Sequence, residues 1–244
     1  MVRFSRLGTL VLAAAVFACP AARAAGAAAS DSTSRRLLSV PSVHVHNVVA
    51  RPVLVLAAGG ALAAWAYGQE NPDVAAARLD GPVGSRIADV GNFYGDGLVI
   101  GGAAAGLYAV GHLGHHAKTA ALGDDLTEAF LFSTAVNWTM KAAFHRQRPN
   151  GGPHSFPSGH TTAAFCVVPV LGHHLGWKAS VPAAVLATAT GLGRIEAHKH
   201  FLSDVLAGAA LGLACGDLVT GKGLLPGGAR AVVSPGVVGV SVAF

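Results

Sequence analysis

Charged residues are scarce in this sequence. They make up 12% of its 244 positions, whereas about 25% is usual in a soluble domain. Hydrophobic residues make up 52%, and glycine alone contributes 32 residues. The formal net charge of +5 suits an anionic substrate or an anionic lipid surface, and no feature indicates nucleic acid. This composition favours a protein in contact with a membrane.

Cysteine and metal-ligand patterns are equally scarce. Cys19 lies near the N-terminus, and Cys166 and Cys215 lie in apolar stretches. An exported protein can form a bridge between the last two, but buried free thiols are the expected state. No cluster of Cys and His has metal-ligand spacing. His44 and His46 alternate, but a solvated segment is the simpler interpretation, so we expect neither a metal nor a cofactor.

Long hydrophobic runs are also absent. The apolar segments extend for about 13 to 19 residues, mostly short of the roughly 20 that a membrane-spanning helix needs. Short, Ala-rich helices are compatible with a soluble exported bundle. The low charge and the G-x-x-x-G spacing of Gly102 and Gly106 favour a membrane. Both arrangements remain open, and membrane association is the preferred one.

The N-terminal residues have the pattern of a secretory signal. Residues 1–24 contain two early arginines, an apolar stretch over 7–18 and an A-x-A sequence at 22–24. Residues 25–52 are polar and mixed, and we expect an exposed arm there. The protein is therefore expected in the cell envelope, on the periplasmic side.

The rest of the chain predicts an all-α fold. We expect a six-helix bundle over residues 53–220 and a short C-terminal β-hairpin in residues 221–244, turning near Pro235. Residues 69–95 are expected as a loop region with at most a short helix over 84–90. The six expected helices are Val53–Gly68, Leu98–Leu113, Asp124–Arg146, His160–Leu175, Val181–Gly193 and Leu202–Val219.

Basic residues are placed to bind an anion. Lys141 and Arg148 are seven residues apart in a helix-compatible run, so they face the same way two turns apart. Pro149 then stops that helix. Arg194 adds a third cation, and its planar guanidinium can hold an oxyanion through two hydrogen bonds.

Two further segments supply a phosphate cradle and a nucleophile. Pro157 to His160 has the features of a helix start, in which Ser158 can cap and Gly159 lets another molecule approach the backbone. The free N–H groups of a helix N-terminus bind phosphate readily. His200 and Asp204 are four residues apart at the start of another helix. The carboxylate can therefore accept the imidazole Nδ1–H and leave Nε2 as a nucleophile.

At these residues the chain resembles the type 2 phosphatidic acid phosphatase and vanadium haloperoxidase superfamily. The three sequence patterns of that family are K-x6-R-P, P-S-G-H and S-R-x5-H-x3-D. The matching residues are Lys141, Arg148 and Pro149, then Pro157 to His160, then Arg194, His200 and Asp204. The one departure is Gly193, where the family usually has serine, and it removes a hydroxyl contact to phosphate. The resemblance extends from about Asp96 to Val219.

The resemblance implies a metal-independent phosphatase for phosphomonoesters or diphosphates, such as a lipid phosphate, an isoprenoid diphosphate or a small soluble ester. His200 would attack phosphorus to form a phosphohistidine, Asp204 would orient it, and His160 would protonate the leaving oxygen and later activate water. His145 and His198 are close enough in sequence to line the same cleft. The implied phosphate-binding residues are Lys141, Arg148, Ser158, Gly159 and Arg194.

Two other functions fit the same resemblance. The cradle that holds phosphate also holds vanadate in the haloperoxidases, although this chain is short for that role. A non-catalytic envelope protein that keeps the fold is the other alternative. The presence of both an acid and an oriented nucleophile favours the phosphatase.

Overall fold

The computed structural model of the chain describes residues 45–221, 229–234 and 237–242. The expected signal segment and most of the expected arm lie outside the described residues. In the described part the helices are α2 (Val45–Tyr67), α3 (Pro72–Ala77), α4 (Pro82–Tyr94), α5 (Gly97–Leu113), α6 (Ala117–Phe144), α7 (Gly159–Leu175), α8 (Trp177–Glu196) and α9 (Leu202–Thr220). The fold is all-helical over residues 45–221, as the sequence predicts.

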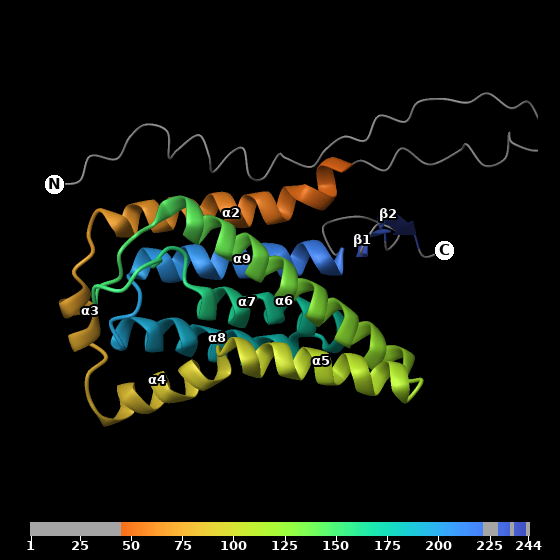
Figure 1. Cartoon of the computed structure of the whole chain (residues 1–244), viewed down its shortest axis with the longest axis horizontal. Helices are drawn as coiled ribbons and strands as arrows, with labels where there is room; N and C mark the ends of the chain where they lie inside the picture. The colour runs from red at the N-terminus through yellow and green to blue at the C-terminus, as the bar shows by residue number, and fades with distance from the viewer. Residues whose placement is uncertain (1–44, 222–228, 235–236, 243–244) are drawn as a thin grey trace, which may run out of the picture. The chain divides into compact units, whose positions relative to one another are not determined.

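The long helices pack side by side with α7 and α9 at the centre (Figure 1). Helix α9 contacts both α2 and α7, α8 lies against α7, and α5 lies against α6. The core is built from small and medium apolar residues such as Ala104, Ala129 and Val170. Both cysteines of this region, Cys166 and Cys215, are buried free thiols, as expected.

The predicted count of six helices is wrong for the described residues, which contain eight. The region expected as a loop folds into α3 and α4. Asn71 caps α3 by accepting the Val74 N–H at 3.2 Å, and Pro72 and Pro82 stand at the first turns of the two helices. Proline is compatible with a helix start because its missing N–H has no partner there in any case. Prolines that suggested loops therefore begin helices.

Several helix boundaries also differ from the predictions. Helix α2 begins at Val45 and continues through Pro52, whereas the prediction had it begin at Val53. Helix α8 likewise continues through Pro182 and begins at Trp177. Helix α6 begins at Ala117, ahead of the acidic residues that suggested its first turn.

Glycines bring two helix pairs into close contact. A Cβ atom added to Gly212 would lie 2.4 Å from the Thr162 carbonyl oxygen, and one added to Gly216 would lie 2.4 Å from that of Cys166. Gly212 and Gly216 of α9 therefore face α7. A Cβ added to Gly193 of α8 would lie 2.7 Å from the Ala88 carbonyl oxygen of α4. The serine usual at this position in the resembling family would not fit here without a shift of α4.

The C-terminal residues form two strands, β1 (Ala229–Ser234) and β2 (Val237–Val242). They pair antiparallel, with Ser234 opposite Val237 and Ala229 opposite Val242. The strands flank Pro235 and Gly236, where the sequence predicts the turn of a hairpin; these two residues lie outside the described ones.

Among the described helices, α9 is long and apolar enough to cross a membrane, and 72% of its most apolar window is buried inside the protein. Helices α4 and α5 satisfy the same criteria as a pair, with a bend of 46° between them. The burial of α9 is equally what a core helix requires. Among the described helices, length and composition thus identify α9, and α4 with α5 as one bent pair, as candidate membrane spans.

Candidate phosphate-binding site

Four helix ends meet on one side of the bundle, at the left in Figure 1. Helix α6 ends at Phe144 and the chain re-enters the bundle at Gly159, while α8 ends at Glu196 and α9 begins at Leu202. The motif residues all lie on these ends or on the two connecting loops. The fold therefore gathers segments that are up to sixty residues apart.

Lys141 lies in the last turn of α6 and is only 6% exposed. Its Nζ donates to the carbonyl oxygens of His154 at 2.7 Å and Ser155 at 3.4 Å, which holds the ammonium beside the start of α7. A Cβ placed on Gly159 would lie 3.8 Å from the Lys141 side chain. Burial, with the charges of two arginines, lowers the pKa of Lys141 to about 8, so the ammonium stays charged at neutral pH.

Helix α6 ends at Phe144, so Arg148 lies in the loop that follows and the predicted shared helical face with Lys141 is wrong. Arg194 lies in the last turn of α8. The Arg148 Nε donates to the Pro153 carbonyl at 3.0 Å, and its backbone N–H donates to Gly152. The Arg194 Nη1 donates to Asn92 Oδ1 of α4 at 3.1 Å, whereas its buried Nε has no hydrogen-bond partner among the described residues. Burial and the nearby Arg148 charge lower the Arg194 pKa. A buried guanidinium N–H without a partner is suited to an anion.

His160 stands in the first turn of α7 with its side chain 34% exposed. Its Nε2 lies 3.9 Å from Asp96 Oδ2, at the start of α5. Burial and the Arg194 charge, only partly offset by Asp96, lower the pKa of His160 to about 4. Without a ligand the imidazole is neutral and faces a region of positive charge.

His200 and Asp204 form a buried pair. The His200 Nδ1 lies 3.6 Å from Asp204 Oδ2, and Ser155 Oγ bridges the gap, 3.5 Å from Nδ1 and 2.5 Å from the same carboxylate oxygen. The His200 backbone N–H donates to the Arg194 carbonyl at 3.1 Å. Burial lowers the pKa of His200 to about 4 despite the Asp204 charge, so the imidazole is neutral at pH 7. Its Nε2 is thus the nitrogen left for chemistry.

Sequence reasoning missed the group that holds Asp204. The Arg146 Nη1 donates to Asp204 Oδ1 at 2.7 Å and to Ser203 Oγ at 2.6 Å, and its Nη2 donates to Glu70 Oε2 at 2.5 Å. Glu70 also accepts the Ser203 backbone N–H at 2.8 Å. The guanidinium lies over the Phe201 ring, 4.0 Å from its centroid. A charged arginine two residues before Arg148, in a chain with few charges, was the available signal.

This network explains the ionisation of Asp204. Its side chain is fully buried, which by itself opposes ionisation. The His200 imidazole, the Arg146 charge and hydrogen bonds from Ser155 and the Phe201 N–H outweigh that cost and hold the pKa below its usual value. The carboxylate is therefore charged and held by at least three separate donors.

The other residues predicted for the site differ in their environment. Ser158 is fully buried, and its Oγ accepts a hydrogen bond from Thr161 at 2.9 Å, so its hydroxyl already has a partner within α7. Gly159 is half-buried at the first helical position. His198, 43% exposed, lies 3.9 Å from Asp73, and His145 stacks near His154 with ring centroids 5.6 Å apart.

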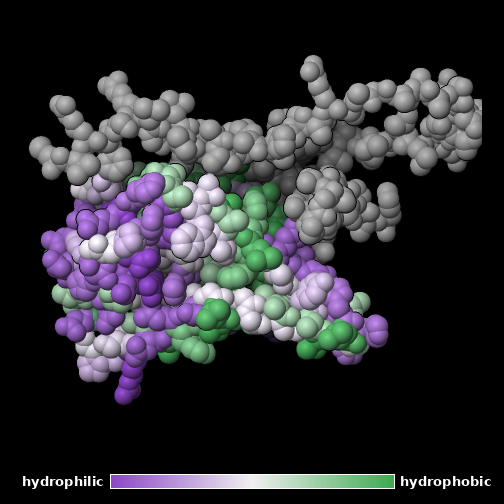
Figure 2. All heavy atoms as spheres, in the orientation of Figure 1, coloured by the Kyte–Doolittle hydropathy of each residue, from purple (hydrophilic) through white to green (hydrophobic). Residues whose placement is uncertain are grey.

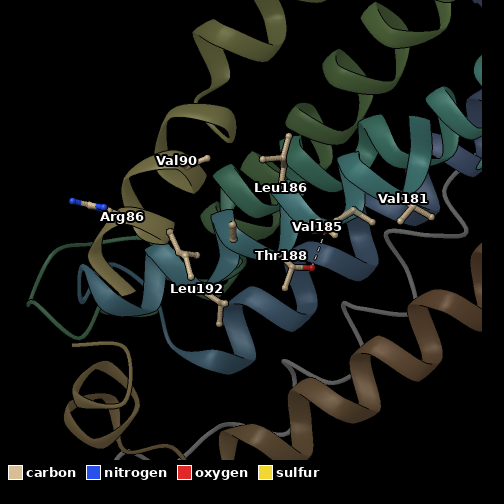
Figure 3. A pocket seen from close by; sticks show the side chains of 10 residues that line it. Arg86, Val90, Val181, Val185, Leu186, Thr188 and Leu192 are labelled. Carbon is tan, nitrogen blue, oxygen red and sulfur yellow. Dashed lines mark hydrogen bonds between the residues drawn. The ribbon is translucent and has the colours of Figure 1, made fainter. Parts of the chain in front are cut away.

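An apolar groove of about 700 Å³ runs between α4 and α8 (Figure 3). Its walls are formed by residues such as Val90 of α4 and Val185 and Leu192 of α8, with Arg86 at one edge. Leu192 is two residues before Arg194, and Val90 is two residues before Asn92, which accepts from that arginine. The groove is distinct from the cluster of cations.

Comparison with known proteins supports the motif assignment. Residues 125–221 match the model of the PAP2 superfamily. Over 82 residues the chain is 40% identical to the lipid A 1-phosphatase of Porphyromonas gingivalis, a match covering 32% of this chain and 18% of that protein. Over 116 residues it is 34% identical to phosphatidylglycerophosphatase B of Bacillus subtilis, covering 40% of this chain and 57% of that protein. The chain thus spans well under two thirds of these relatives.

Two solved structures are similar. The crystal structure of Aquifex aeolicus LpxE matches with a TM-score of 0.47 and 26% identity over 56% of this chain and 85% of that one. The transmembrane PAP2 type phosphatidylglycerolphosphate phosphatase from Bacillus subtilis matches with a TM-score of 0.49 and 24% identity, covering 72% of this chain and 96% of that one. The sequence matches confirm the resemblance read from the three motifs, because all of the motifs lie within residues 125–221.

Proposed function

We propose that this chain, whose residues 125–221 match the PAP2 superfamily, is a phosphatase that transfers a phosphoryl group from an ester to His200 and then to water. The observation that carries the proposal is the arrangement around Arg194. A buried guanidinium nitrogen without a partner lies in a cluster of cations, next to a neutral, carboxylate-paired imidazole. Such a cluster matches the charge of a phosphoryl group and supplies a nucleophile beside it.

In the first step His200 Nε2 attacks phosphorus. Lys141, Arg148 and Arg194 hold the equatorial oxygens and stabilise the charge that spreads over them. The bond from phosphorus to the leaving oxygen breaks as the bond to Nε2 forms. His160 gives its proton to that oxygen, which leaves as an alcohol or as a phosphate. The charge of the bound ester offsets the cations that lower the His160 pKa, so His160 gains its proton as substrate binds.

In the second step water replaces His200. His160, now neutral, takes a proton from the water as its oxygen attacks the phosphohistidine, and the phosphorus–nitrogen bond breaks. Asp204 stabilises the positive imidazole that exists between the two steps. Arg146 and Glu70 are positioning residues, because they act on Asp204 and not on the ester. The three cations supply the charge that a metal ion would otherwise supply.

A lipid phosphate is the proposed substrate class. Both curated relatives are named for phosphatases of lipids, lipid A and phosphatidylglycerophosphate. The α4–α8 groove is lined mostly by apolar side chains, which suits an acyl chain whose phosphate sits among the cations. Isoprenoid diphosphates and small soluble esters present the same phosphoryl group, and a comparison of a diacyl phosphate with a soluble ester separates the last class from acyl lipids.

The proposed location is the cell envelope, on the periplasmic side and in association with the membrane. Large apolar side chains are exposed on several helices, among them Trp65 at 62%, Leu113 at 82% and Trp138 at 63%. Exposed apolar surface of this kind is typical of a membrane contact. Figure 2 shows hydrophilic residues gathered at the end that holds α3 and the start of α4, with hydrophobic residues beyond it. A polar catalytic end beside an apolar flank suits an enzyme working at a lipid surface.

The test is hydrolysis of a chromogenic phosphate ester in the presence of a chelator. The wild type should release phosphate and be inhibited by vanadate, and His200→Ala should lose roughly a thousandfold or more in kcat. His198→Ala, two residues away on the same loop, is the matched control and should keep its activity. Rapid quenching in alkaline detergent, in which a phosphorus–nitrogen bond survives, should trap a phosphoryl label on the wild type and none on His200→Ala. Full turnover by His200→Ala would refute the mechanism.

A second experiment addresses the substrate class. Val185→Asp places a charge in the α4–α8 groove, where Val185 is 64% exposed, and should lower kcat/KM for a diacyl phosphate at least tenfold. Its turnover of the soluble chromogenic ester should not change. Val110→Asp on α5, at a side chain 59% exposed and outside the groove, is the control. Equal activity of both variants on the lipid would exclude the groove as the acyl site.

A further inference from the structure

A second cluster of histidine and aspartate lies at the opposite ends of α6 and α7. Asp125 is in the N-terminal part of α6, and His173 and His174 are in the last turn of α7. Asp125 precedes Lys141 by sixteen residues, which corresponds to about 24 Å along a helix. The catalytic groups described above therefore make no use of this cluster.

We propose that Asp125, His173 and His174 bind a divalent transition-metal ion, such as Zn²⁺. Each residue offers one donor atom, and the three atoms lie within 4.8 Å of one another. The His174 Nε2 lies 2.7 Å from Asp125 Oδ2, so one imidazole and the carboxylate already converge. The rings of His173 and His174 lie edge to face, 4.7 Å between centroids, which directs nitrogens of adjacent residues to one side.

The donor set selects the class of ion. Two imidazole nitrogens and one carboxylate oxygen suit Zn²⁺, Co²⁺, Ni²⁺ or Cu²⁺, whereas Mg²⁺ and Ca²⁺ prefer oxygen ligands alone. At about 2.1 Å from each donor, a tetrahedral ion needs donors separated by about 3.4 Å. Small side-chain rotations achieve this from separations below 4.8 Å. Three protein ligands leave a fourth position for water.

Burial separates this cluster from an ordinary surface ion pair. The Asp125 and His174 side chains are 6% and 13% exposed. The neighbouring pair, His112 of α5 and Asp124 of α6, has a similar distance of 2.8 Å but is 47% and 45% exposed, and it belongs to no three-donor group among the described residues. The buried cluster thus has a preformed third ligand, and the exposed pair provides an internal comparison. A bound ion would join α6 to α7 and stabilise the bundle.

The proposal is tested on the full-length, tag-free protein after treatment with a chelator. Titration with Co²⁺ should give one site per chain with visible d–d absorption bands, and Zn²⁺ should displace the Co²⁺. Saturating Zn²⁺ should raise the Tm by about 5 °C, because an ion that binds only the folded state stabilises it. His173→Ala keeps the Asp125–His174 contact and should weaken binding at least tenfold.

His112→Ala is the matched control and should bind both ions as the wild type does. His44→Ala with His46→Ala removes another histidine pair, the one noted in the sequence, and should also leave the site unchanged. No saturable Co²⁺ band, or an unchanged affinity in His173→Ala, would overturn the proposal and leave a structural ion pair. These experiments measure metal binding and Tm, not phosphate release. A negative result would therefore overturn the metal site without bearing on the proposed phosphatase activity.

Discussion

The two ends of α6 and α7 hold buried carboxylates in different ways. At the phosphate end, Asp204 is fully buried and accepts hydrogen bonds from Arg146, Ser155 and a backbone N–H. At the other end, Asp125 contacts His174, with His173 alongside. A carboxylate enclosed by fixed donors can orient a neighbouring imidazole. One that faces two imidazoles has the ligand geometry of a metal site. The difference shows that the partners of a buried aspartate, more than its burial, decide what it can do.

The largest expected effect comes from removing the negative charge of Asp204 at the phosphate end. Asp204→Asn keeps the shape of the side chain but cannot stabilise a positive His200, so kcat should fall about 10³- to 10⁴-fold. Steady-state kinetics on a chromogenic ester measures this. Asp217→Asn is the control, because Asp217 is also buried on α9 but pairs with Arg51 at 3.1 Å. Similar losses in both variants would contradict a specific role for Asp204.

A smaller loss is expected when the support for Asp204 is removed. Arg146→Gln should lower kcat by about a hundredfold with little change in KM, because Arg146 contacts Asp204 and not the ester. Arg146→Lys should recover part of the activity, and Glu70→Gln should show a milder loss of the same kind. A raised KM with unchanged kcat would instead make Arg146 a phosphate ligand.

The pH dependence of kcat/KM follows from the lowered pKa values of His200 and Lys141 at the phosphate end. His200 has a pKa of about 4, so it is neutral and nucleophilic above that pH, and kcat/KM should fall as pH drops below about 4. Lys141 has a pKa of about 8, so kcat/KM should also fall as pH rises through 8 and the ammonium loses its charge. Lys141→Arg should move the alkaline fall to higher pH, and an unmoved alkaline limb would assign it to another group.

The smallest effects are expected at the opposite end, where Asp125 contacts His174. In metal-free protein, His174→Ala removes a hydrogen bond to a buried carboxylate and should lower the unfolding free energy by about 1–3 kcal/mol. His112→Ala removes an exposed pair and should cost less than about 1 kcal/mol. Chemical denaturation measures both, and neither variant should change turnover per folded molecule. Equal destabilisation would mean that burial does not distinguish the two pairs.

Local signals predicted much of the fold. Apolar periodicity located the long helices, because it depends on residues a few positions apart. The same reasoning failed for α3 and α4, where prolines that begin helices were interpreted as loop residues. Proline specifies only its own φ angle and the loss of one N–H. Whether it ends or begins a helix depends on the residues that follow and on what they pack against.

By itself the sequence determined which residues belong to the phosphate motifs, since their spacing along single helices is a local property. Only the tertiary structure paired Arg146 with Glu70, seventy-six residues apart, and Asp125 with His174, forty-nine residues apart. It also showed why glycine stands at position 193, where Ala88 of α4 leaves no space for a side chain. Contacts between distant segments depend on how helices pack, and no periodicity within one segment encodes the partner that packing brings to it.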